Sequence, residues 1–403
     1  MKSVPNLPTR SKQQVVLGSG PSKHVARLLF TTEAFRPMGT PVPGVPMILD
    51  RDMRLVEPAC GWLMHLALVR GRTRSRETWR TYAETLFDWW QTLEANGWKW
   101  DEVGPLQVAA YRDRMLCAPS DLTGRPYAKS TVNARLRILA LFYSWCRANA
   151  FCARVPFTSS DVRVSRDRSE LFLAHVDASG GCVTANELTV RHTRELPRAL
   201  QIDTLRKLLH GCSTRDRIMI EWALYTGMRR IEVAALQIPQ LATTNSVDSM
   251  PAIRLVVTKG MRPRTIYPPR ALIERTRAYV REERSVVIKR ASRRPEYRAP
   301  DNVFLKRDGS AVSARNLGAM FAYAARRAQV TATYHSLRHT FACTMLRALQ
   351  TQAGGCSDMN PLLTLQTMLG HSSIATTSIY LRVLGHDLAG VERSIGQLYE
   401  TML

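Results

Sequence analysis

The nine residues TYHSLRHTF (333–341) place two histidines and an arginine on one expected helical turn. His335, Arg338 and His339 are spaced i, i+3 and i+4, so their side chains share one side of a helix. A zinc site of the HExxH type needs a glutamate directly after the first histidine. Ser336 stands there instead, and Arg338 would repel a dication, so we expect no metal. For this motif alone, phosphate binding and a purely structural helix start both stay open.

The net charge of the chain favours a polyanionic partner. Lys and Arg total 57 against 33 Asp and Glu, which gives +24. A net positive charge of this size favours nucleic acid as the partner. A solvated basic surface without a specific partner is the alternative. We see no lysine-rich amphipathic helix for a membrane surface and no apolar run of about 18 residues. The N-terminus lacks the apolar stretch of a signal peptide, so we expect a cytoplasmic, nucleoid-associated protein.

Two further segments combine with the first motif. ALYTGMRRIEVAAL (223–236) sets Arg229 just after a glycine turn, and Glu232 lies one helical turn later, where a carboxylate can orient a guanidinium. LGHSSIATTSIYLR (369–382) sets His371 after a glycine and Tyr380 nine residues further on. Each segment alone also suits a surface ion pair or a helix-face aromatic residue. Their joint occurrence in this order points to a common site.

Together these segments resemble the tyrosine recombinase (phage integrase) family. TGMRRIEV (226–233) resembles its first arginine box, HSLRHTF (335–341) its His-x-x-Arg box, and LGHSSIATTSIY (369–380) its His-to-tyrosine box. TKGMRPR (258–264) is similar to its catalytic-lysine hairpin. The resemblance implies the catalytic residues Arg229, Lys259, His335, Arg338, His371 and Tyr380, with Glu232 and His339 in support.

The resemblance also implies a reaction. Tyr380 would attack a DNA phosphodiester and form a 3′-phosphotyrosine with a free 5′-hydroxyl. Arg229 and Arg338 can bind the nonbridging oxygens through paired N–H groups. His335 is the expected base, and Lys259 is the expected acid for the leaving 5′-oxygen. The linkage stores the energy of the phosphodiester, so no ATP, metal or other cofactor is expected, and we find no GxxxxGK[ST] loop.

Three other functions fit parts of the same pattern. A type IB topoisomerase-like enzyme would use a very similar Arg/Lys/His/Tyr set. A catalytically silent DNA-binding protein could use the same scaffold. A basic helical regulator would have a different fold. The complete set of six candidate residues favours a site-specific DNA recombinase that integrates, excises or resolves a mobile element.

The expected fold class is mainly α and multidomain, with a tyrosine recombinase fold that clamps DNA. Residues 1–50 hold seven of the 21 prolines and predict a basic N-terminal extension. Residues 51–157 predict a helical DNA-binding domain similar to the family's core-binding (SAM-like) domain, with helices over about 75–95 and 130–149. Residues 158–197 are expected to be a linker. Residues 198–403 predict an α-rich catalytic domain with a small antiparallel β-sheet and a tail at 384–403.

The expected partner is double-stranded DNA. Candidate phosphate contacts lie near the starts of the two helices, where N–H groups favour anions: Arg76, Arg80, Lys129 and Arg135. The resemblance further implies recombination sites with inverted repeats and a homo-tetramer on paired sites. It also implies accessory DNA-bending proteins or a partner recombinase. The tail would dock either on its own domain or on the neighbouring subunit.

Overall fold

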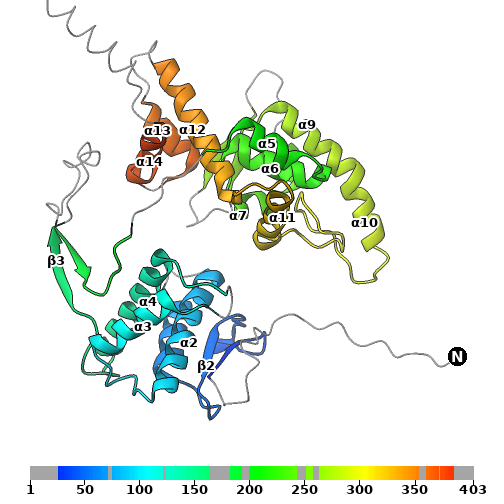
Figure 1. Ribbon diagram of the computed structural model, residues 1–403. Helices are drawn as coiled ribbons and strands as arrows, with labels where there is room; N and C mark the ends of the chain where they lie inside the picture. Colours follow the sequence, from blue (N-terminus) through cyan, green and yellow to red (C-terminus); the bar gives the residue numbers. More distant parts are fainter. Residues whose placement is uncertain are drawn as a thin grey trace, which may run out of the picture. The chain divides into compact units, whose positions relative to one another are not determined.

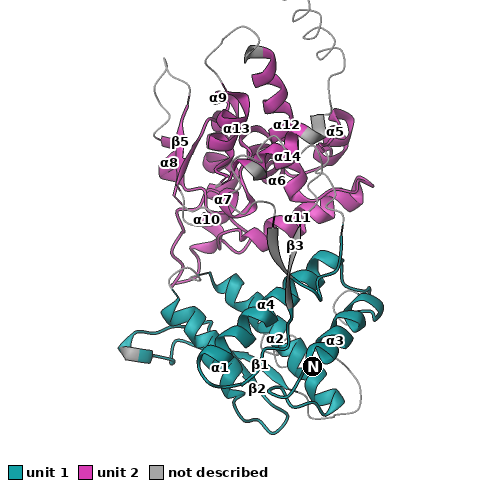
Figure 2. Cartoon of the chain, turned by 90° about the vertical axis from the view of Figure 1, so that its left-hand side faces the viewer, with its two compact units in different colours: residues 1–193 teal, residues 194–403 magenta. Residues whose placement is uncertain are grey.

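The computed structural model describes residues 26–70, 75–120, 124–163, 182–192, 199–242, 251–256, 263–353, 360–371 and 373–384. The chain divides into two compact units, residues 1–193 and 194–403 (Figure 2). Both units are largely helical, and the sheets among their described residues are all two-stranded and antiparallel. The expected mainly α fold with a small antiparallel sheet is therefore confirmed. Within the described part of the chain, no helix combines the length and the apolar character needed to cross a membrane.

The described residues of unit 1 form four α-helices and two β-ribbons, of which α2, α3, α4, β2 and β3 are labelled in Figure 1. The helices are α1 (Glu57–Met64), which continues into a π-helical turn η2 (His65–Val69), α2 (Arg76–Asn96), α3 (Pro105–Cys117) and α4 (Lys129–Ala148). The ribbons pair β1 (Arg27–Phe30) with β2 (Pro46–Leu49) and β3 (Ser159–Arg163) with β4 (Cys182–Asn186). A short 3-10 turn η1 (Pro37–Gly39) lies between β1 and β2.

The two helices expected in unit 1 are confirmed to within about one residue at each end. α2 ends at Gly97, whose φ of 65° is left-handed and suits glycine. Its apolar stripe buries Trp79, Leu86 and Trp89, and the Trp89 indole donates a hydrogen bond of 3.1 Å to the Tyr143 hydroxyl on α4. Burial of these large side chains holds α2 against α4.

The N-terminal region differs from the expected extension over residues 1–50. β1 and β2 pair in the register Arg27↔Leu49, and Ile48 is fully buried in the core of unit 1. The Ile48 backbone exchanges two hydrogen bonds of 3.3 Å with the Cys60 thiol. Strands of four residues are too short for a clear alternating pattern, and Pro46 is tolerated because it begins an edge strand. Residues 1–25 lie outside the described residues.

The expected linker, 158–197, also contributes to unit 1. Besides the β3–β4 ribbon, Leu188 is buried in the core of this unit. The Asn133 side chain on α4 exchanges two hydrogen bonds of 2.8 Å with the backbone of Val190. These contacts fix the segment before Thr193 to the helices of unit 1.

Unit 2 packs its helices around α6 (Thr214–Thr226). The N-terminal half contains α5 (Ile202–Leu209), α7 (Arg230–Ala234), α8 (Ile238–Ala242), and the strands β5 (Ile253–Leu255) and β6 (Arg264–Ile266). It continues through α9 (Arg270–Tyr279), the π-helical turn η4 (Val280–Arg284) and α10 (Ser285–Ala291). The last helices are α11 (Ala314–Arg327), α12 (Tyr334–Ala353), α13 (Pro361–Leu369) and α14 (Ile374–Leu384). α6 packs against α12 and α9 (Figure 1), because α6 is apolar around most of its circumference.

Candidate active site

Two glycines end helices at the centre of unit 2. α6 stops at Gly227, with φ of 65°, and α13 stops at Gly370, with φ of 62°. A Cβ at Gly227 would lie 2.5 Å from Cδ1 of Phe341, and one at Gly370 would lie 2.7 Å from Cδ of Arg264. Both conformation and space therefore require glycine. The last carbonyls of each helix lack helical partners and carry the negative end of the helix dipole.

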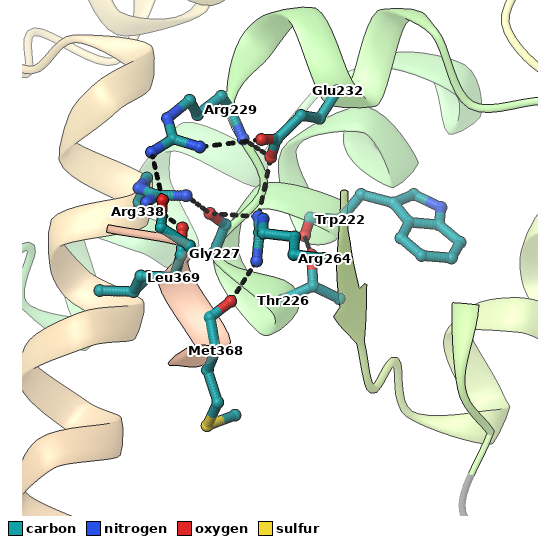
Figure 3. Close-up of polar contacts among 10 residues, drawn as sticks. Trp222, Thr226, Gly227, Arg229, Glu232, Arg264, Arg338, Met368 and Leu369 are labelled. Atoms are coloured by element: carbon teal, nitrogen blue, oxygen red, sulfur yellow. Dashed lines mark hydrogen bonds and ion pairs between the residues drawn. The ribbon is translucent and has the colours of Figure 1, made fainter. Parts of the chain in front are cut away.

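Arg338 on α12 binds the carbonyls of both helix ends (Figure 3). Its Nη1 donates to the Gly227 carbonyl at 2.5 Å, and its Nη2 donates to the Leu369 carbonyl at 2.7 Å. The residue is only 1% exposed. Burial, together with the positive charges of Arg229 and Arg264, lowers the pKa of Arg338 to about 9. The guanidinium stays charged at neutral pH and joins three helices.

Arg229 precedes α7 and is oriented by Glu232. The Glu232 carboxylate accepts hydrogen bonds from the Arg229 backbone N–H at 2.8 Å and from its Nη1 at 2.9 Å. Nη2 of Arg229 reaches the Gly370 carbonyl at 3.5 Å. Burial alone would raise the pKa of Glu232, but the charges and hydrogen bonds of Arg264 and Arg229 hold this pKa below its ordinary value. Glu232 is therefore an ionised, buried support for Arg229.

Arg264, the first residue of β6, belongs to the same cluster and was missed by the sequence analysis. Its Nη2 binds Oε2 of Glu232 at 2.7 Å and the Gly227 carbonyl at 3.4 Å, and its Nη1 binds the Met368 carbonyl. The sequence carries one indication, because alternate residues of a strand share a face and Arg264 therefore lies on the same face as the apolar Ile266. The structure buries both residues and exposes Thr265. Lys259, in the same sequence segment, lies outside the described residues.

Tyr380 on α14 faces two histidines. Its hydroxyl and Nδ1 of His339 are joined by a hydrogen bond of 3.0 Å, and its ring stacks on His371 with centroids 6.4 Å apart. Tyr380 is 2% exposed. Burial raises the pKa of Tyr380, and the charges of Arg338 and Arg229 oppose this rise. The tyrosine is therefore protonated at neutral pH.

His371 is held neutral beside the arginines. Its Nδ1 is 2.9 Å from Oγ1 of Thr377, one turn into α14. Burial and the charges of Arg338, Arg229 and Arg264 lower the pKa of His371 to about 3. A neutral imidazole at this position can donate or accept a hydrogen bond but carries no charge at physiological pH.

The two histidines of α12 occupy different positions from those expected. His335 is exposed, and its ring centroid is 4.4 Å from that of His339. His339, expected as a supporting residue, makes the direct contact to Tyr380. The spacing predicted that both rings share a helix face. Which of them meets the tyrosine depends on how α14 packs on α12, and sequence spacing does not give this.

The candidate DNA contacts of unit 1 differ among themselves. Arg76 and Lys129 are exposed at the starts of α2 and α4. Arg80 binds Glu84 at 2.8 Å and lies over the Phe30 ring at 5.7 Å, partly exposed.

Arg135 differs from the other three candidates because its side chain has protein partners on α2 and beside α4. Its Nη1 binds Asp88 at 2.5 Å, its Nη2 binds the Tyr127 hydroxyl at 3.2 Å, and its guanidinium lies over the Tyr127 ring. It joins α4 to α2, because nearly two turns into α4 its side chain reaches the partly buried Asp88 carboxylate. A phosphate contact by Arg135 stays a prediction.

The chain is similar to known proteins over most of its length. Residues 198–386 match the Phage integrase family. Tyrosine recombinase XerC of Lacticaseibacillus casei (strain BL23) is 27% identical over 319 residues, which cover 77% of this chain and 90% of the relative. Tyrosine recombinase XerD of Mycobacterium tuberculosis (strain ATCC 25618 / H37Rv) is 28% identical over 211 residues, 49% of this chain and 61% of the relative.

Two solved structures share the fold. XerH site-specific recombinase bound to palindromic difH substrate has a TM-score of 0.50 at 18% identity and covers 82% of this chain and 83% of its own. A lambda integrase(75-356) dimer bound to a COC' core site has a TM-score of 0.51 at 13% identity and covers 81% and 96%. Residues 198–386 therefore carry a domain of the Phage integrase family, and the relatives that the chain matches are tyrosine recombinases. The chain is a site-specific recombinase, as the sequence predicted.

Proposed function

We propose that this recombinase cuts and rejoins duplex DNA through a covalent bond to Tyr380. The observation that carries the proposal is the convergence of the Tyr380 hydroxyl, two histidines and the Arg229–Arg338 pair on the ends of α6 and α13. In the cleavage step, Oη of Tyr380 attacks phosphorus and the P–O5′ bond breaks, which leaves a 3′-phosphotyrosine and a 5′-hydroxyl. The reverse attack by the 5′-oxygen reseals the strand without an outside energy source.

The electrostatics of the site suit an anionic transition state. Glu232 binds the guanidinium groups of Arg229 and Arg264, and Arg338 binds the neighbouring Gly227 carbonyl, so these four described side chains carry excess positive charge. The Arg229 side chain is 21% exposed. A guanidinium has five N–H donors, and Arg338 uses one bond from each terminal nitrogen for the scaffold. Preorganised donors of this kind stabilise charge that develops on the nonbridging oxygens.

Proton transfer is the second requirement, because Tyr380 starts protonated. His339 already shares a hydrogen bond with the hydroxyl, so we assign it the first acceptor position, with His335 beside it to pass the proton onward. His371, neutral at physiological pH, would hydrogen-bond to the phosphate. Lys259 stays the proposed acid for the 5′-oxygen on the strength of the family resemblance.

The partners proposed from the sequence are duplex DNA with inverted-repeat sites and a homo-tetramer on paired sites. One solved neighbour is bound to a palindromic difH substrate and the other is a dimer bound to a COC' core site, which supports the DNA-binding part. Action on DNA would place the protein at the nucleoid in the cytoplasm. Accessory proteins, a mobile element and exchange of the tail between subunits belong to the same proposal, and residues 385–403 lie outside the described residues.

A covalent-trapping assay tests the proposal. The protein is incubated with duplexes nicked near the cleavage position, so that the 5′-hydroxyl fragment diffuses away, and SDS-resistant adducts are separated on a gel. A site-specific recombinase gives an adduct at its own site only. A topoisomerase-like enzyme gives adducts on arbitrary duplex, and a silent DNA-binding protein gives none. Tyr380→Phe serves as the control that should abolish the adduct.

A further inference from the structure

Arg264 adds positive charge to the cluster but is assigned no contact with the reacting atoms, yet it binds several other members of the cluster. Its side chain is 4% exposed. Its two terminal nitrogens contact three groups from three elements: the Glu232 carboxylate on α7, the Gly227 carbonyl after α6 and the Met368 carbonyl near the end of α13 (Figure 3). The close approach of Gly370 to its stem, where a Cβ would lie 2.7 Å from Cδ, shows that the loop is shaped around this side chain.

Two of these three acceptors also bind a group that we propose to bind phosphate, and the third lies close to such a group in the sequence. Glu232 also holds Arg229. The Gly227 carbonyl also holds Arg338. Met368 is three residues before His371. A single guanidinium thus binds the groups that hold Arg229 and Arg338, and it also binds a carbonyl near the helix end that leads to His371.

Retaining a charged group at this position is costly. Guanidinium burial is unfavourable unless its donors are paired, and Nε of Arg264 has no hydrogen-bond partner among the described residues. A lysine would carry the same charge, but an ammonium lacks the planar fork that reaches two separate acceptors at fixed angles. The geometry of the guanidinium, more than its charge, is what the site uses.

We propose that Arg264 is a positioning residue that holds the side chains of Arg229, Arg338 and His371 in the arrangement that binds the phosphate. Arg264 begins β6, five residues after Lys259 in the sequence, so it also anchors the strand that follows the proposed acid. This inference rests on the proposed function, since it gives Arg264 a role only through groups that act on the phosphodiester.

The test compares Arg264→Met and Arg264→Lys with the wild-type full chain. Arg254→Met is the matched control, because Arg254 is exposed on the paired strand β5, opposite Thr265. Single-turnover cleavage is measured on a nicked site with a normal scissile phosphate and on one with a methylphosphonate, which is neutral. Thermal melting and single-site DNA binding are measured in parallel.

We expect Arg264→Met to cleave the normal site about 10²-fold more slowly, in the range for a lost oxyanion donor. On the methylphosphonate site, Arg264→Met should cleave less than about tenfold more slowly than wild type, because less negative charge develops there for the site to stabilise. Arg264→Lys should fall between Met and wild type on the normal site, and Arg254→Met should match wild type. A purely structural role would slow both substrates equally.

Other outcomes overturn the inference. Cleavage of the normal site by both variants within about threefold of wild type removes the positioning role. An equal loss on both substrates does the same, as does failure of both variants to fold, since either result makes Arg264 a stability residue only. If the wild type itself forms no adduct, the proposed function fails first. An active wild type with unaffected variants refutes this inference alone.

Discussion

Replacement of Glu232 by glutamine should destabilise unit 2 and disable the site together. The carboxylate is fully buried and accepts from Arg229 twice and from Arg264 once, at 2.7–2.9 Å. Glutamine keeps one acceptor oxygen but turns an NH₂ group toward a guanidinium or a backbone N–H. Three arginines would then share a buried cluster without a counter-charge.

The magnitude follows from the burial. Removal of one partner of a buried ion pair costs about 3–5 kcal/mol, because the other charge stays buried and unpaired. For a unit of roughly 200 residues, each kcal/mol lowers the melting temperature by about 2–4 °C. Glu232→Gln should therefore melt about 6–20 °C below wild type at neutral pH. Glu282→Gln, an exposed carboxylate on η4, should change melting by less than about 2 °C.

The pH dependence provides an independent check. The folded pKa of Glu232 lies below its ordinary value of 4.5. Its stabilisation is therefore fully present above about pH 4.5 and is lost as pH falls through the lower folded pKa. The gap between wild type and Glu232→Gln, measured by calorimetry or circular dichroism, should be largest near pH 7 and narrow in acid. A variant that melts with wild type at pH 7, or a gap that widens in acid, would refute the buried-support role.

The remaining predictions concern the cleavage reaction, the salt dependence of DNA binding and the stability of the protein in acid. Tyr380→Phe should bind single sites with wild-type affinity and give no SDS-resistant adduct; an adduct would transfer the role to another residue, with Tyr399 next in sequence. Arg229→Lys and Arg338→Lys should each slow single-turnover cleavage by about 10²–10³-fold, and a rate within tenfold of wild type contradicts the phosphate clamp. The +24 charge should give a log–log salt dependence of about −0.9 per neutralised phosphate; filter-binding slopes shallower than about −3 argue against a clamp around the duplex. The folded pKa of His371, about 3, lies below its ordinary 6.5, so its contribution to stability is present above pH 6.5 and is lost as pH falls toward 3. His371→Asn should flatten that part of the profile in denaturant titrations at pH 7.5 and 5, and an unchanged slope would exclude this residue as its source.

Much of the helical framework could be predicted because its signals are local. The ends of α2 and α6 follow from Gly97 and Gly227, whose positive φ is a property of the residue itself. The N-terminal ribbon could not be predicted in the same way. β1 and β2 are four residues each, and their support is Cys60 and other core residues that come later in the sequence. The same holds for Arg135, because its partner Asp88 is 47 residues away.

Within the site, the residue types followed from the motifs, and the family resemblance supplied their order. The contacts among them depend on tertiary packing. His339 meets Tyr380 only because α14 lies against α12. Arg264 was overlooked because two of its three acceptors are main-chain carbonyls. Every residue has such a carbonyl, so residue types do not show which ones accept a hydrogen bond. A buried-face arginine in a short strand is the kind of local conflict that marks functional sites.

The use of main-chain oxygens by Arg338 and Arg264 has a consequence for how this family of sequences can diverge. A carbonyl is present whatever side chain its residue carries, so positions 368 and 369 can change, within the limits of core packing, without removing an acceptor. The arginines have no such freedom. Paired-position covariation detects side chains that change together, so it should be blind to these contacts although they join three helices and a strand. A library randomised at Met368 and Leu369 should retain the arginine scaffold wherever α13 still ends at Gly370.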